Sequence, residues 1–430
     1  MPRETRMIEL REKEKALLVT ADIFSMRTKG FSVEDEASEL RELAKTSGAD
    51  IIEEVVCHYD KPSPNLFIGK GKAAELNLLA EEHGINVVIF SYDLSGTQQR
   101  NLEEEIGCKV IDRTQIILDI FAQHAKGPEG KMQVELAQLE YLLPRLTGKG
   151  IMLSRLGAGI GTRGPGEQKL EVDRRKIRGR IARLKEDLKK VTSHRELIRK
   201  KRKEEAIPLV SLVGYTNAGK TTLLNSLTNE QQLADESLFT TLDPLSRMLI
   251  LPNNQKVILS DTVGFLHHLP HHLIEAFKAT LEDVKKADFL IHVLDISHPL
   301  RYGHFDAVNV VLKELDAGSK PIITALNKLD KLEDKGWLEK YKLDFPNSVA
   351  ISALRKENLG ELLEKITGGV SVSMQEVDIV LPLDKMSLVD LIYREGQVKE
   401  IEYTSKSINI RAFLPIVTIS KIEGYVKSKE

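Results

Sequence analysis

The sequence predicts an α/β protein built from several domains. Apolar strand-like runs alternate with amphipathic helical stretches in two separate parts of the chain, and two heptad-like apolar stretches lie between these parts. The length of 430 residues also exceeds what one hydrophobic core normally serves, since a domain usually holds roughly 100 to 200 residues. We therefore expect more than one core.

The composition is typical of a folded protein in water. Hydrophobic residues make up 41% of the chain and charged residues 29%, which excludes disordered and collagen-like classes. No apolar run approaches the roughly 20 residues that cross a bilayer, and residues 1–13 carry charges where a signal peptide needs an apolar stretch. We therefore expect a cytoplasmic protein. Cys57 and Cys108 are too few for a disulfide framework, and we interpret both as packing thiols.

The first predicted domain covers residues 1–125. Helical stretches and strand-like runs alternate along it, with the runs at 15–21, 51–59, 86–92 and 109–113. This alternation predicts a small α/β domain with a mostly parallel sheet. Ser32, followed by Asp35, predicts a helix N-cap in which the side-chain oxygen accepts a hydrogen bond from a backbone N–H.

Residues 126–205 are predicted to form an antiparallel helical hairpin. Apolar residues recur at spacings of three and four along two stretches, one starting at Met132 and the other at Ile177, so the two apolar seams can pack on each other. Between them, the glycine-rich segment 145–169 predicts a long loop at the tip. Its glycines allow the backbone to approach a phosphate or a stacked base closely.

Positive charge is concentrated in this hairpin. The whole chain has a net charge of −2, but residues 145–204 hold 20 Lys and Arg against 7 Asp and Glu, a net charge of +13. Such a segment predicts an anionic partner, most economically nucleic acid, because Lys and Arg that bind phosphates release counterions. The alternative is a solvated helix face. The predicted RNA contacts are Arg145, Lys149, Arg155, Arg163, Arg174 and Arg175.

A third domain, residues 206–370, begins with a phosphate-binding motif. A strand-like run leads into GYTNAGKTT, which matches the P-loop pattern GxxxxGK[ST] between a strand and a helix. Its backbone N–H groups can surround a β-phosphate, Lys220 can offset the charge of the β- and γ-phosphates, and the Thr221 hydroxyl can bind Mg²⁺. The predicted nucleotide-binding residues here are Gly214, Tyr215, Thr216, Asn217, Ala218, Gly219, Lys220, Thr221 and Thr222.

A second motif, DTVGF, follows a strand that ends at Asp261. This carboxylate can hold magnesium through a water molecule, and Gly264 can donate its N–H to a γ-phosphate. Between the two motifs, Thr240 or Thr241 can complete the magnesium shell while the γ-phosphate is present, and we favour Thr241. The nucleotide-binding residues predicted in the second motif are Asp261, Thr262, Val263 and Gly264.

Two later motifs predict which base is bound. In the NKLD sequence of Asn327, Lys328 and Asp330, the carboxylate can accept hydrogen bonds from guanine N1–H and the exocyclic amine, and adenine offers no such pair of donors. In the later SAL sequence, the backbone of Ser352 and Ala353, next to Leu354, can meet the guanine oxygen. The motifs, in this order, predict a GTP-binding domain.

Together with FIGKGKAAEL, DRTQIILDIFAQHA and GTRGPGEQKLEVDRR upstream, these motifs resemble the HflX family of translational GTPases, in the Obg and HflX group, over about residues 10–370. The resemblance implies a hairpin that reaches into the large ribosomal subunit and a role in splitting or rescuing stalled ribosomes, especially under stress. The GEQKLEVD segment departs from the family pattern, which is closer to GETQLExD.

Phe265 stands where many GTPases carry the glutamine that orients the attacking water. A phenyl ring cannot do this, so we predict slow intrinsic hydrolysis that the large ribosomal subunit stimulates, with Lys220, Thr241 and Gly264 as the catalytic residues. Asn217 resembles an asparagine that helps to hold potassium in GTPases without that glutamine. The predicted cofactors are therefore Mg²⁺ and, as a second candidate, K⁺.

Residues 371–430 are predicted to form a small α+β C-terminal domain. The full prediction is thus a P-loop GTPase domain that follows a small α/β domain and a hairpin, in a chain that we expect to be a monomer. We interpret the histidines at 267, 268, 271 and 272 as part of a mobile switch segment rather than as a metal site. Two alternatives stay open, a GTP-gated ribosome assembly or hibernation factor and an RNA-remodelling ATPase that uses the N-terminal domain.

Overall fold

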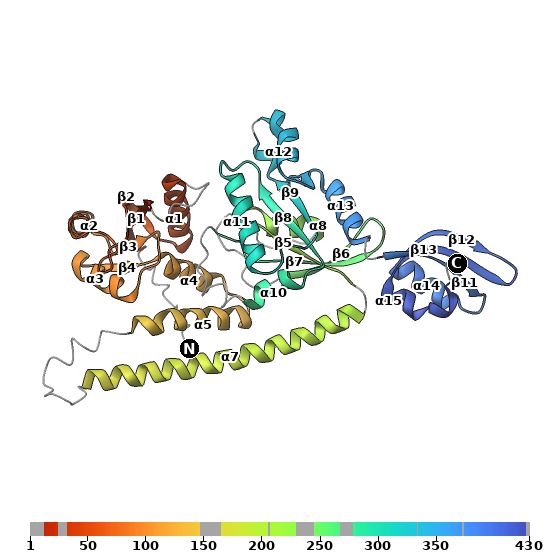
Figure 1. The fold of residues 1–430 in the computed structure, drawn as a ribbon, viewed down its shortest axis with the longest axis horizontal. Helices are drawn as coiled ribbons and strands as arrows, with labels where there is room; N and C mark the ends of the chain where they lie inside the picture. The colour runs from red at the N-terminus through yellow and green to blue at the C-terminus, as the bar shows by residue number, and fades with distance from the viewer. Residues whose placement is uncertain are drawn as a thin grey trace, which may run out of the picture. The chain divides into compact units, whose positions relative to one another are not determined.

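The computed structural model of the chain (Figure 1) describes most of its 430 residues. The described ranges are 13–24, 32–146, 165–204, 207–228, 245–266, 278–332, 334–371 and 374–426. The chain divides into two compact units, one of residues 1–125 with 131–185 and the other of residues 126–130 with 186–430. The division into four domains stays a prediction.

A parallel four-stranded sheet with the order β2-β1-β3-β4 forms the centre of the first unit. Its strands are β1 (Lys15–Ile23), β2 (Asp50–Tyr59), β3 (Val87–Phe90) and β4 (Lys109–Ile111). The helices that alternate with them are α1 (Val33–Ser47), α2 (Lys70–His83), α3 (Gly96–Ile106) and α4 (Arg113–His124). The predicted α/β alternation and parallel sheet are confirmed, since each crossover contains the helix that parallel neighbours require.

Helix α1 begins with the predicted cap. The Ser32 hydroxyl accepts a hydrogen bond from Asp35 N at 3.2 Å, and the Asp35 carboxylate accepts one from Ser32 N at 2.8 Å. Ser95 and Gln98 form the same capping box at α3. Both cysteines are free thiols that pack within the first unit, and burial raises the pKa of each.

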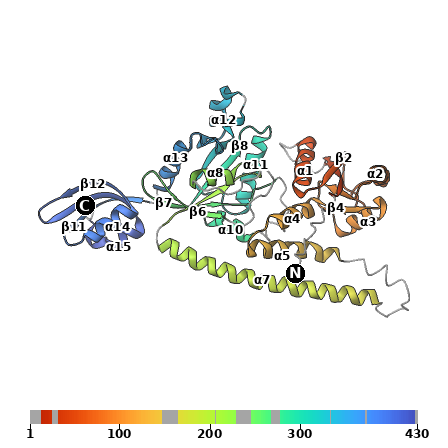
Figure 2. The same ribbon diagram turned by 180° about the vertical axis from the view of Figure 1, so that it is seen from behind.

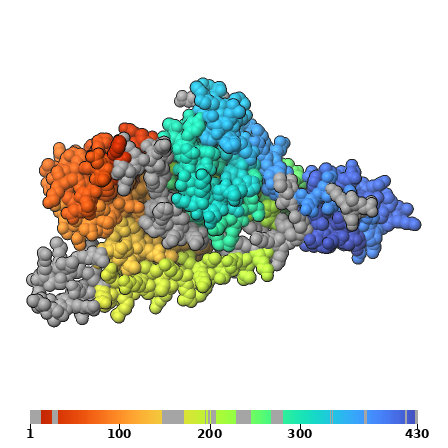
Figure 3. Space-filling model, in the orientation of Figure 1, coloured from red at the N-terminus to blue at the C-terminus, as the bar shows by residue number. Residues whose placement is uncertain are grey.

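Helices α5 (Pro128–Arg145) and α7 (Pro165–Glu204) lie side by side in both views of the ribbon (Figures 1 and 2). Leu136 and Leu184, one from each predicted seam, are buried. The Arg180 guanidinium binds both oxygens of Glu135 at 2.6 and 2.7 Å, which joins the two helices at their exposed side. Much of the remaining side-chain surface of α7 is exposed, as Figure 3 shows for the face in view.

The second unit contains a six-stranded sheet with the order β10-β9-β8-β5-β7-β6, in which only β6 runs antiparallel to its neighbour. Its strands are β5 (Leu209–Val213), β6 (Leu245–Ile250), β7 (Lys256–Asp261), β8 (Phe289–Asp295), β9 (Ile322–Asn327) and β10 (Ser348–Ala350). The α-helices described around it are α8 (Lys220–Thr228), α10 (Lys278–Lys286), α11 (Arg301–Glu314), α12 (Leu338–Asp344) and α13 (Leu359–Ser371), and short 3₁₀ turns lie at η2 (Leu329–Lys331) and η3 (Lys335–Trp337).

Hydrophobic clusters cover both faces of this sheet. Residues of α8 and α13 pack on one face, and residues of α10 and α11 pack on the other. Parallel strands that are buried on both faces expose functional groups mainly where they end, so the carboxyl ends of β5, β7, β8 and β9 form the edge at which a ligand is expected.

The last part of the chain forms an antiparallel sheet with the order β11-β13-β12 and two helices, which confirms the predicted α+β class. Its elements are β11 (Met374–Pro382), α14 (Met386–Glu395), β12 (Gln397–Tyr403), β13 (Ser407–Pro415), α15 (Ile416–Lys421) and η4 (Glu423–Tyr425). Among the described residues, no helix has the length and apolar character that a membrane span needs.

Candidate nucleotide-binding site

Strand β5 leads directly into the predicted phosphate-binding loop. Gly214 comes directly after β5 and lies against β8. A Cβ atom at this position would lie 2.3 Å from the Val293 carbonyl oxygen. Asn217 and Gly219 have φ angles of 57° and 92°, in the left-handed region that Asn and Gly tolerate best. The loop therefore needs these residue types both for its tight turn and for its contact with the sheet.

Lys220 begins α8 and is buried inside this loop. Its Nζ donates hydrogen bonds to the carbonyl oxygens of Tyr215 at 2.8 Å and of Gly214 at 3.1 Å. Burial lowers the pKa of Lys220 to about 8, the Asp261 carboxylate opposes this shift, and the charge of Lys328 adds to it. A cation that is deprived of water in this way favours an anionic ligand such as a phosphate.

Thr221 and Asp261 are brought together although they lie far apart in the sequence. The Thr221 hydroxyl donates to Asp261 Oδ2 at 2.7 Å, and the fully buried carboxylate also accepts the N–H of Thr262 at 2.9 Å. Hydroxyl and carboxylate oxygens are the ligands that Mg²⁺ prefers. The donor set fits that ion, and these two residues would hold it.

Gly264 and Phe265 extend β7 along the phosphate loop. Phe265 N donates to the Gly214 carbonyl oxygen at 3.1 Å, and Thr216 N donates to the Phe265 carbonyl oxygen at 2.9 Å. A Cβ atom on Gly264 would lie 2.8 Å from Thr216 Cα, so only glycine fits this approach. The Phe265 ring is 1% exposed and packs in a core cluster with Leu281.

The NKLD sequence joins two other parts of the site. Asn327 Nδ2 donates to the Ala218 carbonyl oxygen of the phosphate loop at 2.8 Å, and Asn327 Oδ1 accepts the N–H of Ala353 at 2.9 Å. A Cβ atom on Gly219 would lie 2.3 Å from Asn327 Nδ2. Asn327 therefore holds the phosphate loop and the SAL sequence in one arrangement.

Asp330 is held by the side chain of Ser352, another predicted site residue. The Ser352 hydroxyl donates to Asp330 Oδ1 at 2.5 Å, while the backbone N–H of Ser352 donates to the Glu357 carbonyl oxygen at 3.2 Å. The backbone N–H groups of Ser352 and Ala353 are both paired within the protein, and their contact with a guanine oxygen stays a prediction. The Ser352 side chain orients the carboxylate that was predicted to select guanine.

Sequence reasoning missed two residues at this edge. Asp295 ends β8 and forms an ion pair with Lys328, with Oδ2 and Nζ 2.8 Å apart. His304 of α11 stacks on Tyr215 of the phosphate loop, with ring centroids 3.8 Å apart and an angle of 9° between the planes. The position of Asp295 at the end of a buried strand-like run was a usable signal, whereas no local pattern predicts the stacking of His304.

Several predicted residues cannot be placed in this site. Thr241, the histidines at 267, 268, 271 and 272, and the tip-loop cations Lys149, Arg155 and Arg163 lie outside the described residues. Within the described part of the chain, no group of three or more His, Cys, Asp or Glu side chains could hold a metal ion. Arg175 is exposed and Arg174 is half-buried on α7.

Arg145 requires a correction. Its guanidinium donates hydrogen bonds to the Asp112 carboxylate and to the carbonyl oxygen of Leu94, at 2.9 and 2.6 Å. It also covers the Tyr141 ring, with its central carbon 3.4 Å from the ring centroid. The geometry makes Arg145 part of the packing of the first unit and not an exposed RNA contact.

Comparison with known proteins identifies the family. The family models "GTP-binding GTPase N-terminal", "GTP-binding GTPase Middle Region", "50S ribosome-binding GTPase" and "HflX C-terminal domain" match residues 34–122, 124–202, 209–328 and 338–414. The GTPase HflX of Caldanaerobacter subterraneus is 44% identical over 420 residues, which covers 97% of this chain and 95% of that protein. This chain belongs to the HflX family of GTPases.

A second HflX relative agrees with this assignment. The GTPase HflX of Escherichia coli is 40% identical and covers 89% of this chain and 90% of its own length. A crystal structure of a GTP-binding protein from Sulfolobus solfataricus in complex with GDP is 25% identical, with a TM-score of 0.43, and covers 84% of this chain and 99% of that chain. The HflX-family chain described here is accordingly an enzyme that binds GTP and hydrolyses it to GDP and phosphate.

Proposed function

We propose that this GTPase binds the large ribosomal subunit in its GTP state, splits or rescues stalled ribosomes, and is released by hydrolysis. The observation that carries the proposal is the unneutralised basic surface of α7. Arg175, Lys176 and Arg178 are exposed there, and none of them forms an ion pair with another described residue. Cations that are not neutralised within the protein are available for RNA phosphates. The family model described as "50S ribosome-binding GTPase" supports the choice of partner.

GTP would be held by the residues that meet at the sheet edge. Lys220 and the loop of residues 214–219 would bind the phosphates, Asp330 would accept hydrogen bonds from guanine, and Leu354 would lie beside the base. Mg²⁺, held by Thr221 and Asp261, would neutralise charge on the phosphates when bound. Thr241 remains the proposed third ligand, and K⁺ beside Asn217 remains a proposed second cation.

Hydrolysis in this site depends on positioning and on charge stabilisation, because phosphoryl transfer needs little covalent chemistry from the protein. Lys220 provides a positive charge at the phosphates, and Gly264 can offer its N–H to the transferred group. The Phe265 ring is buried in the core, so this side chain does not hold the attacking water. We therefore propose that the intrinsic rate is low and that the ribosome completes the site.

The contact between Phe265 and the phosphate loop suggests how GTP controls ribosome binding. The backbone of Phe265 is hydrogen-bonded to Gly214 and Thr216, so a γ-phosphate that draws Gly264 toward itself would change the position of Phe265 against the phosphate loop. GTP can favour the ribosome-binding state only by binding that state more tightly than GDP does. The wild-type chain should thus bind ribosomes more tightly with GTP than with GDP.

The decisive experiment measures steady-state GTP hydrolysis with and without purified large ribosomal subunits. A matched variant has residues 150–166 replaced by a short linker. We expect a large stimulation by the subunits and its loss in the variant, whose hydrolysis without ribosomes should be unchanged. The same proteins are added to intact ribosomes, and the subunits are separated on gradients. Absence of stimulation would overturn the proposal, and subunit separation that persists equally without nucleotide would favour a GTP-independent binding factor.

A further inference from the structure

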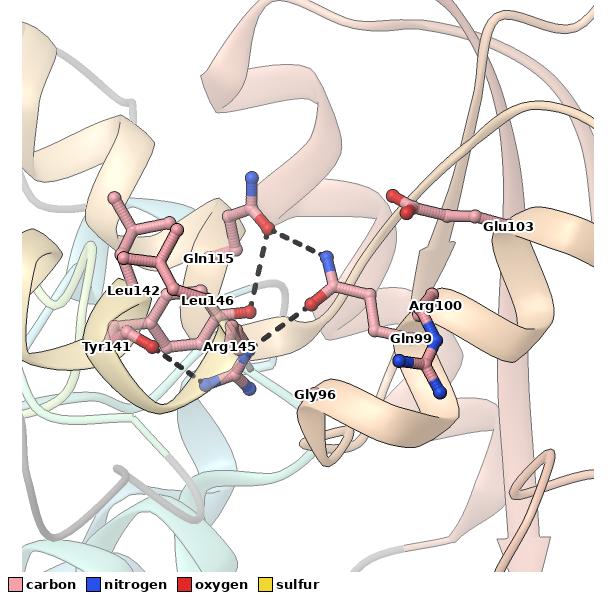
Figure 4. Close-up of a pocket in the computed structure, with 9 residues that line it drawn as sticks. All are labelled: Gly96, Gln99, Arg100, Glu103, Gln115, Tyr141, Leu142, Arg145 and Leu146. Atoms are coloured by element: carbon pink, nitrogen blue, oxygen red, sulfur yellow. Dashed lines mark hydrogen bonds between the residues drawn. The ribbon is translucent and has the colours of Figure 1, made fainter. Parts of the chain in front are cut away.

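The end of helix α5 is fixed to the N-terminal sheet domain by one arginine. Arg145 Nη2 donates to the carbonyl oxygen of Leu94 at 2.6 Å and to Asp112 Oδ2 at 2.9 Å. Its Nη1 donates to the carbonyl oxygen of Tyr141 at 3.1 Å, and its Nε donates to Gln99 Oε1 at 3.2 Å. Figure 4 shows the guanidinium between Tyr141 of α5 and Gln99 of α3. A single side chain thus joins three elements of the first unit.

Asp112, the anionic partner, is itself part of the fold. The carboxylate is fully buried and caps α4 by accepting the N–H of Gln115 at 2.9 Å. It also accepts the N–H of Leu94 at 3.1 Å, just before α3 begins. Burial raises the pKa of Asp112, and the Arg145 charge opposes that shift. Arg145 therefore compensates a carboxylate that cannot reach water or RNA.

Beside these hydrogen bonds, the packing between α3 and the end of α5 contains a cavity. A cavity of about 150 Å³ separates them, lined on one side by Arg100 and Glu103 and on the other by Leu142 and Leu146 (Figure 4). The helices come close at Gly96, where a Cβ atom would lie 3.1 Å from both Cα and Cγ of Arg145, and at Gln99, which accepts the Arg145 hydrogen bond. Because apolar packing is incomplete here, the bonds of Arg145 hold this end of the helix.

The position of Arg145 matters because α5 ends at this residue. Leu146 still donates its N–H to the carbonyl oxygen of Leu142 at 3.1 Å, and the chain then continues into residues 147–164, where RNA contacts were predicted. The Arg145 contacts hold in place the last described turn of α5, from which that segment continues. An end that is fixed before binding leaves less conformational entropy to be lost on binding.

We propose that Arg145 is a positioning residue for ribosome binding, which acts by anchoring α5 through Asp112 and does not touch RNA. The inference rests on the proposed function, since it takes ribosomal RNA as the partner. Arginine is required because its planar fork satisfies several acceptors while it stacks on Tyr141, and a lysine ammonium cannot do both.

Two substitutions test the proposal. Arg145→Lys keeps the charge but removes the fork, and Asp112→Asn leaves the arginine intact while it alters a buried group that RNA cannot reach. Asparagine caps a helix about as well as aspartate, so α4 should remain capped. Arg180→Lys is the matched control. Arg180 also makes a bidentate ion pair, with Glu135, but it is exposed, whereas Arg145 pairs with a buried carboxylate.

Binding to purified large subunits is measured with a non-hydrolysable GTP analogue, together with amide hydrogen exchange over residues 142–146 without ribosomes. We expect Arg145→Lys and Asp112→Asn each to weaken binding at least tenfold and to speed exchange at the helix end, with ribosome-free GTP hydrolysis unchanged. Arg180→Lys should change neither quantity by more than about twofold.

The outcomes separate the two roles of Arg145. If Asp112→Asn binds as tightly as the wild type or more tightly, the arginine acts as a direct contact and the proposal is wrong. Unchanged exchange in Arg145→Lys would also overturn it. A wild-type chain that does not bind large subunits would refute the proposed function alone, because faster exchange in the variants would still support the anchoring of α5 by Arg145.

Discussion

At the scale of single residues, Lys220 shows how burial prepares a site for its ligand. The amine donates to two carbonyl oxygens of its own loop and has a pKa lowered to about 8 by burial. Phosphates would restore the usual preference for the protonated form, because opposite charges raise the pKa of an ammonium group. Binding of nucleotide and of a proton are therefore linked.

This linkage predicts proton uptake on GTP binding. Burial lowers the pKa of the unliganded Lys220 to about 8 and phosphates raise it, so GTP binding should take up more of a proton at pH 8.5 than at pH 7. The affinity for GTP should decrease as pH rises above about 8. Calorimetric titrations in two buffers of different ionisation enthalpy measure the uptake. Lys220→Arg is the control, since arginine stays protonated, and equal proton uptake by both proteins would contradict the prediction.

Gly264 is the second residue whose role depends on close contact. A Cβ atom there would meet backbone and side chain of Thr216 at 2.8 Å and Lys220 Nζ at 3.0 Å. Gly264→Ala must push the segment away from the phosphate loop, so we expect at least a tenfold loss in the rate of GTP hydrolysis with a smaller change in GDP affinity.

Gly360 provides the matched control for that substitution. It lies near the start of α13, and a Cβ atom there would meet no neighbouring atom within 4 Å, so Gly360→Ala should leave hydrolysis and GDP affinity unchanged. Both variants are compared by single-turnover hydrolysis and by fluorescent GDP titration. A Gly264→Ala protein with wild-type turnover would show that the close approach is not needed for catalysis.

At the scale of elements, α7 carries two sets of basic side chains, one that forms ion pairs with α5 and one that does not. Arg180 and Lys185 form ion pairs with Glu135 and Glu140 of α5, at 2.6 and 2.7 Å. Arg175, Lys176 and Arg178 have no such pairing among the described residues and are exposed. The net charge of the sequence cannot distinguish these two sets, because the pairing depends on which helix lies alongside.

The unpaired set should determine how ribosome binding depends on salt. Replacing Arg175, Lys176 and Arg178 together by Gln should weaken binding and reduce the slope of log Kd against log salt by roughly 0.7 to 0.9 for each phosphate that the variant no longer binds. The control replaces Arg180 and Lys185 by Gln, with a smaller expected change in slope. Equal changes in slope for both variants would show that the pairing seen in the structure does not decide which cations meet RNA.

At the scale of the whole molecule, the two compact units should respond differently to nucleotide. The residues that meet at the GTP site, from Gly214 to Ala353, all belong to the second unit. A ligand that binds only the folded state stabilises it by about 2.7 kcal/mol at one hundred times its Kd. That stabilisation should stay within the unit that holds the ligand unless the units are coupled.

Amide hydrogen exchange with and without GDP tests this expectation. Slower exchange should be confined to residues 207–371, and the sheet domain at residues 32–124 should exchange at an unchanged rate. Exchange over α1 is the readout for the first unit, because its capping box is remote in sequence from every predicted nucleotide contact. Equal protection of both regions would show that nucleotide binding is coupled to the first unit.

Much of the fold could be predicted because it depends on local patterns. The alternation of strands and helices, the cap at Ser32 and the phosphate loop each depend on residues within one or two turns of the chain. The proximity of Thr221 to Asp261 was predictable as well, since parallel strands bring their carboxyl ends to the same edge. The compact units and the orientation of Ser352 were not predictable in this way.

The sequence by itself determined the family, the nucleotide chemistry and the class of each domain, because motifs that bind phosphate or cap a helix act through neighbouring backbone groups. Only the tertiary structure decided that Arg145 forms an ion pair with Asp112, that Lys328 pairs with Asp295, and that Ser352 orients Asp330. A charged or polar side chain acts on whatever group folding places within hydrogen-bond distance, and that group is often remote in sequence.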